Sequence, residues 1–209
     1  MTTWAEGPVT TVGEAGAPAV LVLHPWWGVT PGVLWWADQL ASAGRRAVVP
    51  DLFGGATPTT EDDAEAHAQA VLNSPDAVAY VERCGDDLAA EGRPWAAMGW
   101  SMGAFLACGL AGRGAAAPHD LVLFYGGWPP GGEVGTRRVD MHVVPGDGFF
   151  DEDEEREPTE AAFRDAGVDL TVHEYPGQEH WFAEPGSPTY DEVAAALARD
   201  RVLDRLRAG

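Results

Sequence analysis

Short apolar runs alternate with longer segments of helical periodicity from residue 19 to the end of the chain. The apolar runs are typical of buried strands, and they occupy 19–24, 46–50, 95–100, 121–125, 139–145 and 168–176. Helices are predicted over 31–43, 61–73, 75–91, 101–112, 157–166 and 189–207. This alternation predicts an α/β fold in a single domain over residues 1–209, with a mostly parallel sheet and helices on both faces.

The most specific motif is Gly99-Trp100-Ser101-Met102-Gly103, which matches the pattern G-x-S-x-G between a predicted strand and a predicted helix. In such a turn the serine is held in a strained conformation, and glycine two positions away on either side avoids a collision. The hydroxyl then projects from the sheet at a helix N-terminus, where backbone amides favour a developing oxyanion. We interpret Ser101 as the nucleophile of an α/β-hydrolase; a serine that merely caps a helix has the same local pattern.

A serine hydroxyl needs an adjacent base, and the α/β-hydrolase order along the chain is Ser, then an acid, then His. His180 lies in a loop after the last predicted strand, from which an imidazole can reach Ser101. Asp147 directly follows the preceding strand. We therefore predict a catalytic triad of Ser101, Asp147 and His180, in which the aspartate orients the imidazole and stabilises its charged form. A turn role for Asp147, or Asp151 as the acid, is the alternative.

Two backbone N–H groups are expected to bind the oxyanion. One belongs to Met102, the residue after the nucleophile. The other belongs to Trp26 in the loop after the first apolar run, because Pro25 has no N–H. Further aromatic residues are predicted at the same edge of the sheet. We interpret them as the wall of a substrate pocket rather than as core, and they are Trp27, Trp100, Tyr125, Trp128 and Trp181.

The composition disfavours some classes of partner. Asp and Glu number 33 against 13 Lys and Arg, a formal net charge of −20 that repels nucleic acid and anionic membranes. The first residues lack the regions of a signal peptide, and no run approaches the roughly 18 to 20 apolar residues of a membrane span. Cys84 and Cys108 are not at metal-ligand spacing. We therefore expect a cytoplasmic enzyme that acts on a small molecule without a metal or cofactor.

Six segments, in the same order, together resemble the dienelactone hydrolase family over residues 8–207. They are HPWWG at 24–28, VVPDLFGG at 48–55, GWSMGA at 99–104, FYGGWP at 124–129, the acid loop at 145–148 and YPGQEHWFAE at 175–184. The resemblance implies an α/β-hydrolase fold with a sheet of the eight-strand class and no large lid domain. It also implies a triad at Ser101, Asp147 and His180, with oxyanion donors at Trp26 and Met102.

Three positions depart from the members of that family that cleave dienelactone. Those members use Cys where this chain has Ser101, and a Glu that interacts with the thiol where this chain has Pro25. They bind the anionic lactone with arginines, and one of these positions is Glu184 here. Because a carboxylate there would repel an anionic substrate, we expect a neutral ester or lactone.

The sequence therefore predicts a serine hydrolase that cleaves a small carboxylic ester or lactone through an acyl-enzyme on Ser101. Two other hypotheses stay open. One is a thioesterase or acyltransferase on the same triad, and the other is a non-catalytic binding protein on a hydrolase scaffold. No pattern in the chain specifies an oligomeric state.

Overall fold

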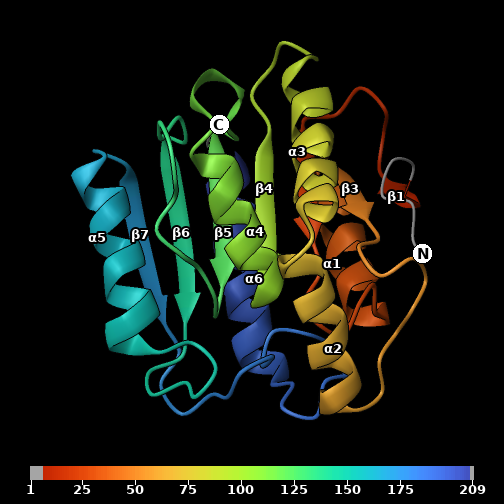
Figure 1. Ribbon diagram of the computed structural model, residues 1–209, viewed down its shortest axis with the longest axis vertical. Coiled ribbons are helices and arrows are strands. Elements are labelled where there is room, and N and C mark those ends of the chain that lie inside the picture. Colours follow the sequence, from red (N-terminus) through yellow and green to blue (C-terminus); the bar gives the residue numbers. More distant parts are fainter. Residues whose placement is uncertain (1–6, 208–209) are drawn as a thin grey trace.

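A seven-stranded sheet runs through the part of the chain that the computed structural model describes, residues 7–207 (Figure 1). The strand order is β1-β3-β2-β4-β5-β6-β7. Neighbouring strands are parallel except for the outermost pair, β1 and β3, which is antiparallel. The predicted α/β fold with a mostly parallel sheet is thus confirmed. The strands are β1 Val9–Val12, β2 Ala19–Leu23, β3 Arg46–Pro50, β4 Ala96–Trp100, β5 Asp120–Phe124, β6 Arg138–Val143 and β7 Asp169–Glu174.

Helices cover both faces of the sheet, as predicted (Figure 1). One face carries α2 Glu61–Leu72, α3 Pro75–Ala89, α4 Met102–Ala111 and α5 Glu157–Asp165. The other carries α1 Pro31–Ser42 and α6 Glu192–Arg207. Short helical segments of other types occupy Gly114–Ala116 and Glu152–Arg156. None of the described helices is long and apolar enough to span a bilayer.

The central strands are buried on both sides, which explains their continuous apolar sequences. In β2, Leu21 and Leu23 contribute to the core beneath α2 to α5, whereas Val20 and Val22 contribute to the core beneath α1 and α6. Because the strands from β2 to β7 are parallel, their carboxyl ends meet at one edge of the sheet. The loops that leave this edge hold the candidate site, as is usual for open α/β sheets.

The strand β1 is absent from the sequence prediction. Its sequence, Val-Thr-Thr-Val, is mostly exposed and lacks a continuous apolar run. It forms because it extends the sheet beyond β3, pairing Val9 with Pro50 and Val12 with Ala47. The sheet has seven strands within residues 7–207, one fewer than the eight-strand class that the family resemblance implied.

Candidate active site

Ser101 lies in a tight turn between β4 and α4, with φ +50° and ψ −114°. This backbone conformation is strained for a residue with a side chain, and it persists only where the surroundings impose it. A Cβ at Gly99 would lie 2.4 Å from the carbonyl group of Gly103. One at Gly103 would lie 2.1 Å from the Leu23 carbonyl oxygen. The turn therefore needs glycine at both positions of the motif.

Replacing Gly103 with alanine is expected to destabilise the fold by about 3 kcal/mol or more, because the new methyl group would collide with main-chain oxygens. Gly109 supplies a matched control in α4, since a Cβ there would meet no heavy atom within 4 Å. We expect Gly109→Ala to stabilise the protein by about 0.5 to 1 kcal/mol, because alanine favours a helix more than glycine does. Urea unfolding measures both variants. Equal changes in the free energy of unfolding would contradict the crowding at Gly103.

Asp147 and His180 form a buried pair beyond the ends of β6 and β7. Nδ1 of His180 and Oδ2 of Asp147 are 2.6 Å apart, and the two side chains are 3% and 2% exposed. The other oxygen of Asp147 accepts a hydrogen bond from the Phe149 N–H at 2.9 Å, so Asp147 also shapes its own turn. Asp151, the alternative acid, instead accepts from the Glu154 N–H and caps the following helical segment. The geometry therefore favours Asp147 as the partner of the imidazole.

The imidazole of His180 lies among aromatic rings that also border Ser101. Its ring centroid is 4.6 Å from that of Tyr125 and 5.0 Å from that of Phe149. Both of these rings line the cavity that contains Ser101. Gly126, next to Tyr125, packs so closely that a Cβ there would lie 2.6 Å from the Ser101 carbonyl oxygen. Nε2 of His180 is buried and finds no hydrogen-bond partner among the described residues, so it is not bonded to the Ser101 hydroxyl here.

The cavity beside Ser101 has a volume of about 470 Å³, which lies within the range of small-molecule sites. Four of the residues predicted for the site line it, namely Ser101, Trp26, Met102 and Tyr125. Gly126 and Gly127, from the segment at 124–129, also line it, whereas no motif identified the rest of the wall. That rest comprises aromatic rings from α4 and the loop after β6, acidic side chains from α2 and the segment before α5, and three further residues of α2. These residues are Phe105, Phe149, Phe150, Glu61, Asp62, Glu65, Glu155, Ala68, Gln69 and Leu72.

Four of the aromatic residues predicted for the pocket do not line the cavity of Ser101. Trp27 and Trp181 form a second layer behind Trp26, with ring centroids 5.6 and 5.7 Å from that of Trp26. Trp100 is fully buried in the core beneath α1 and α6, because strand alternation directs its side chain to that face of β4. Trp128 is 46% exposed. The predicted pocket role of Trp100 is therefore wrong. That of Trp128, whose ring centroid lies 6.1 Å from that of the cavity residue Phe105, stays a prediction.

The loop that carries Trp26 is held by a buried histidine. Nε2 of His24 accepts a hydrogen bond from the Leu52 N–H at 3.0 Å, and its Nδ1–H donates to the Pro25 carbonyl oxygen at 2.7 Å. These two bonds require the neutral imidazole. Burial lowers the pKa of His24, which also favours this neutral form. His24 thereby fastens the loop after β2 to the loop after β3.

Glu184, the position expected to repel anionic substrates, does not line the cavity of Ser101. It is 3% exposed, and its Oε1 accepts a hydrogen bond from the Tyr125 hydroxyl at 2.6 Å. Burial raises the pKa of Glu184 to about 8, with the hydrogen bond from Tyr125 opposing the rise. The Glu184 side chain is therefore mostly protonated at pH 7. The expectation that it repels anions is corrected, and any such selection comes from other side chains.

The raised pKa of Glu184 makes the protein less stable as the pH rises. The folded state keeps a proton that the unfolded state loses near pH 4.5, so the free energy of unfolding falls from there to about pH 8. We expect Glu184→Gln to remove this loss, so that the variant gains about 2 to 4 kcal/mol over the wild type between pH 5 and pH 8. Denaturant unfolding at the two pH values measures the gain. A pH-independent difference would show that Glu184 is ionised throughout.

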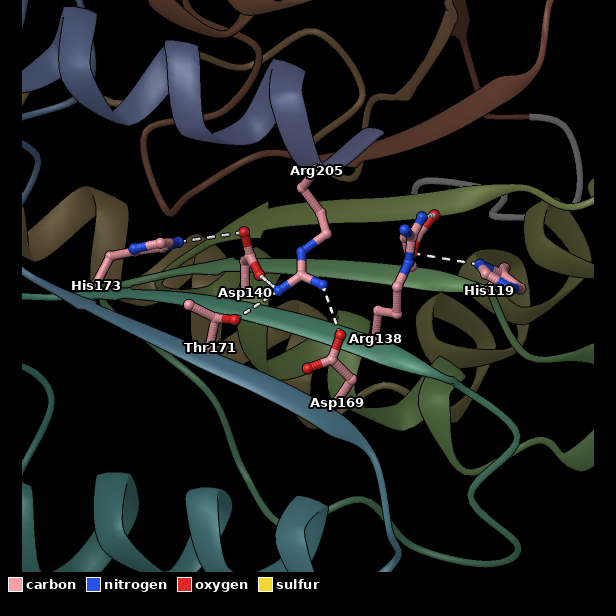
Figure 2. Close-up of polar contacts among 8 residues, drawn as sticks. His119, Arg138, Asp140, Asp169, Thr171, His173 and Arg205 are labelled. Atoms are coloured by element: carbon pink, nitrogen blue, oxygen red, sulfur yellow. Dashed lines mark hydrogen bonds and ion pairs between the residues drawn. The ribbon is translucent and has the colours of Figure 1, made fainter. Parts of the chain in front are cut away.

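A second polar cluster lies between the sheet and α6. Donor atoms of Asp140, His142 and His173 lie within 4.8 Å of one another, close enough to ligate one metal ion. Figure 2 shows Asp140 turned toward the guanidinium of Arg205, which also pairs with Asp169 at 3.0 Å. The linear sequence hides this group, because only the register of β6 and β7 places His142 beside His173. Arg205 already supplies Asp140 with a positive partner, and we assign the cluster no metal.

Comparison with known proteins identifies the chain. Residues 6–208 match the dienelactone hydrolase family. The chain belongs to this family. Carboxymethylenebutenolidase 1 of Cupriavidus pinatubonensis is 30% identical over 207 residues, which cover 91% of this chain and 86% of that protein. As a member of the dienelactone hydrolase family, the protein is a hydrolase.

Two solved structures show how widely the fold of this dienelactone hydrolase family member is shared. A dienelactone hydrolase-like promiscuous phosphotriesterase from metagenomic libraries is 21% identical, with a TM-score of 0.74 over 93% of this chain and 88% of its own. A thermophilic esterase from Thermogutta terrifontis is 16% identical, with a TM-score of 0.66 over 96% of this chain and 88% of its own. At these identities the likeness establishes the common α/β-hydrolase fold.

Proposed function

We propose that this member of the dienelactone hydrolase family is a serine hydrolase that cleaves small carboxylic esters or lactones through an acyl-enzyme on Ser101. The observation that carries the proposal is the meeting of three features around Tyr125 and Phe149. They are the strained turn at Ser101, the cavity of about 470 Å³ beside it, and the buried pair of His180 and Asp147.

In the proposed reaction the Ser101 oxygen attacks the substrate carbonyl carbon, and Nε2 of His180 accepts the hydroxyl proton. The N–H groups of Met102 and Trp26, two residues that line the cavity, stabilise the oxyanion of the tetrahedral intermediate. The imidazolium then protonates the departing alcohol oxygen as the C–O bond breaks. Water that is deprotonated by His180 attacks the acyl carbon, which releases the acid and restores Ser101.

Asp147 serves this reaction by fixing the state of the imidazole. Its oxygen, 2.6 Å from Nδ1 of His180, keeps the proton on that nitrogen and leaves Nε2 free to act as the base. The reaction requires Nε2 to approach the Ser101 hydroxyl when substrate binds. Catalytic hydrogen bonds are commonly long before substrate is present and tighten in the substrate complex.

The names of the relatives agree with chemistry at esters and lactones. One relative is a carboxymethylenebutenolidase, and two structural neighbours are an esterase and a promiscuous phosphotriesterase. A serine nucleophile with a neighbouring imidazole supports attack at each of these kinds of ester. We therefore assign oxygen esters and lactones as the substrate class, ahead of thioesters.

Treatment with a fluorophosphonate probe, followed by peptide mass spectrometry, tests the nucleophile. We expect covalent labelling of Ser101, together with turnover of p-nitrophenyl acetate and of small lactones by the same preparation. Thioesters and alcohol acceptors assayed in parallel distinguish ester hydrolysis from thioesterase or acyl-transfer activity. A folded protein that is neither labelled nor active on any of these substrates would overturn the proposal and support a binding role.

A further inference from the structure

Four carboxylates line the cavity of Ser101. Glu61, Asp62 and Glu65 belong to α2, and Glu155 belongs to the segment before α5. None of the four forms an ion pair within residues 7–207, and no Arg or His side chain from that range lines the cavity. The cavity therefore carries negative charge that the surrounding side chains do not balance.

The nearest arginine along the chain is already engaged. Arg156 directly follows Glu155, yet its guanidinium pairs with Glu152, Glu160 and Glu174. It is also buried, so its side chain is fixed by these contacts. Arg156 therefore stabilises the segment before α5 and leaves the carboxylates of the cavity without a cation.

Helix geometry places a row of α2 side chains, three of them polar, along the cavity. Glu61, Glu65, Gln69 and Leu72 follow one another at steps of three or four residues and so share one face of α2. Acidic residues in a first turn stabilise the N-terminus of any helix, which accounts for Glu61 and Asp62 in α2 and contributes at Glu155 in the segment before α5. That effect does not account for Glu65, which lies one turn later in α2. Glu155 also accepts a hydrogen bond from the Asp151 N–H at 3.0 Å, a neutral donor that does not balance its charge. The charges therefore converge on the cavity from two elements.

Aromatic rings share the cavity with these carboxylates. Phe105 and Phe149 are 40% and 53% exposed, although both are large apolar side chains. Both line the cavity, together with Trp26. Exposed apolar rings at a concave surface indicate a ligand that covers them, and aromatic faces attract cations in particular. The exposed rings are an observation independent of the carboxylates. Like the carboxylates, they favour a ligand that carries a positive charge.

We propose that the cavity selects esters that carry a quaternary ammonium group. This inference rests on the proposed function of Ser101 as an esterase nucleophile. A cationic ester gains attraction from the four carboxylates and contact with the aromatic rings. A neutral ester gains only the contact with the aromatic rings, and an anionic ester is repelled by the carboxylates. Narrow clefts lined by one sign of charge also raise the local concentration of ligands of the opposite sign.

Three acetate esters of similar size test the charge preference. They are acetylcholine, 3,3-dimethylbutyl acetate, in which carbon replaces the charged nitrogen, and 3-acetoxypropanoate, which is anionic. We expect kcat/KM for acetylcholine to exceed that for the neutral ester by about tenfold or more, and the anionic ester to be the poorest substrate. The preference for acetylcholine should decline as ionic strength rises, because salt screens the carboxylates.

A double variant identifies the residues responsible. Glu61→Gln/Glu65→Gln removes two charges from the cavity face of α2, and we expect it to reduce the acetylcholine preference by about three- to tenfold. The matched control Glu192→Gln/Asp204→Asn removes the same number of charges from α6, on the opposite face of the sheet. The control should leave the preference unchanged. An equal loss in both variants would assign the effect to net charge and overturn the inference.

Choline, which has no ester bond, separates cation binding from catalysis. Calorimetric titration should show choline binding to the wild-type protein and weaker binding to the α2 variant. Hydrolysis of neutral esters by a protein that neither binds choline nor prefers acetylcholine would refute the charge selection and leave the proposed function standing. Binding of choline by a protein that cleaves no ester would refute the proposed function and identify the cavity as a cation site without hydrolysis.

Discussion

Ser101→Ala is expected to lower kcat for p-nitrophenyl acetate by about 10⁴-fold or more while the protein stays folded. The reason for the lost turnover is that alanine lacks the oxygen that forms the acyl-enzyme. The reason for the retained fold is that alanine has the same Cβ as serine and meets the same strain at φ +50°. Steady-state kinetics and thermal unfolding of wild type and variant measure the two effects separately.

The exposed Ser42 at the end of α1 provides the control for this substitution. Ser42→Ala should keep wild-type kcat, since this hydroxyl is outside the cavity. A folded Ser101→Ala protein that retains turnover within about tenfold of the wild type would exclude an acyl-enzyme on Ser101. In that case another nucleophile, or a directly activated water, would carry the reaction.

Asp147→Asn is expected to reduce kcat by about 10⁴-fold with little change in the free energy of unfolding. The asparagine oxygen can still accept the hydrogen bond from the Phe149 N–H. The NH₂ group of the asparagine then faces Nδ1 of His180. It donates a hydrogen bond to this nitrogen, whereas the carboxylate of Asp147 accepts one from it. The imidazole is thereby driven to the tautomer that carries its proton on Nε2, which cannot accept the proton of Ser101.

Asp151→Asn is the matched control, because Asp151 was the competing candidate for the acid and is exposed. Its side chain caps the segment before α5, and asparagine caps helices about as well as aspartate. We expect this variant to retain kcat. Comparable losses of kcat in both variants, measured with p-nitrophenyl acetate, would reject Asp147 as the specific partner of His180.

Features encoded by local sequence could be predicted well. The buried strands are continuous apolar runs because helices cover both faces of the sheet. Each of these strands could therefore be predicted from its run of apolar residues. The turn at Ser101 was recognisable because its geometry excludes every residue but glycine at Gly99 and Gly103. The pairing of Asp147 with His180 followed from the order of elements, since parallel strands bring their carboxyl ends to one edge.

Features that depend on the packing of distant segments could not be predicted. Trp100 adjoins the nucleophile in sequence, yet strand alternation buries it on the opposite face of the sheet. Glu184 was expected to present a charge to the substrate, because a sequence does not show that its carboxyl group is buried against the Tyr125 hydroxyl. The acidic wall of the cavity was missed for the same reason. Its residues lie on a helix whose orientation is fixed only by tertiary contacts.

The helix α2 is anchored by three small buried side chains, Ala64, Ala68 and Val71. Much of its remaining surface meets solvent or the reaction chamber, where substitutions disturb packing little. If the cavity selects substrates by charge as proposed, exchanges on this one peripheral helix would change the substrates that descendants of the protein accept, while the proposed triad at the strand ends stays unchanged. Natural selection or an engineer would then be able to alter part of the substrate choice without altering the catalytic residues.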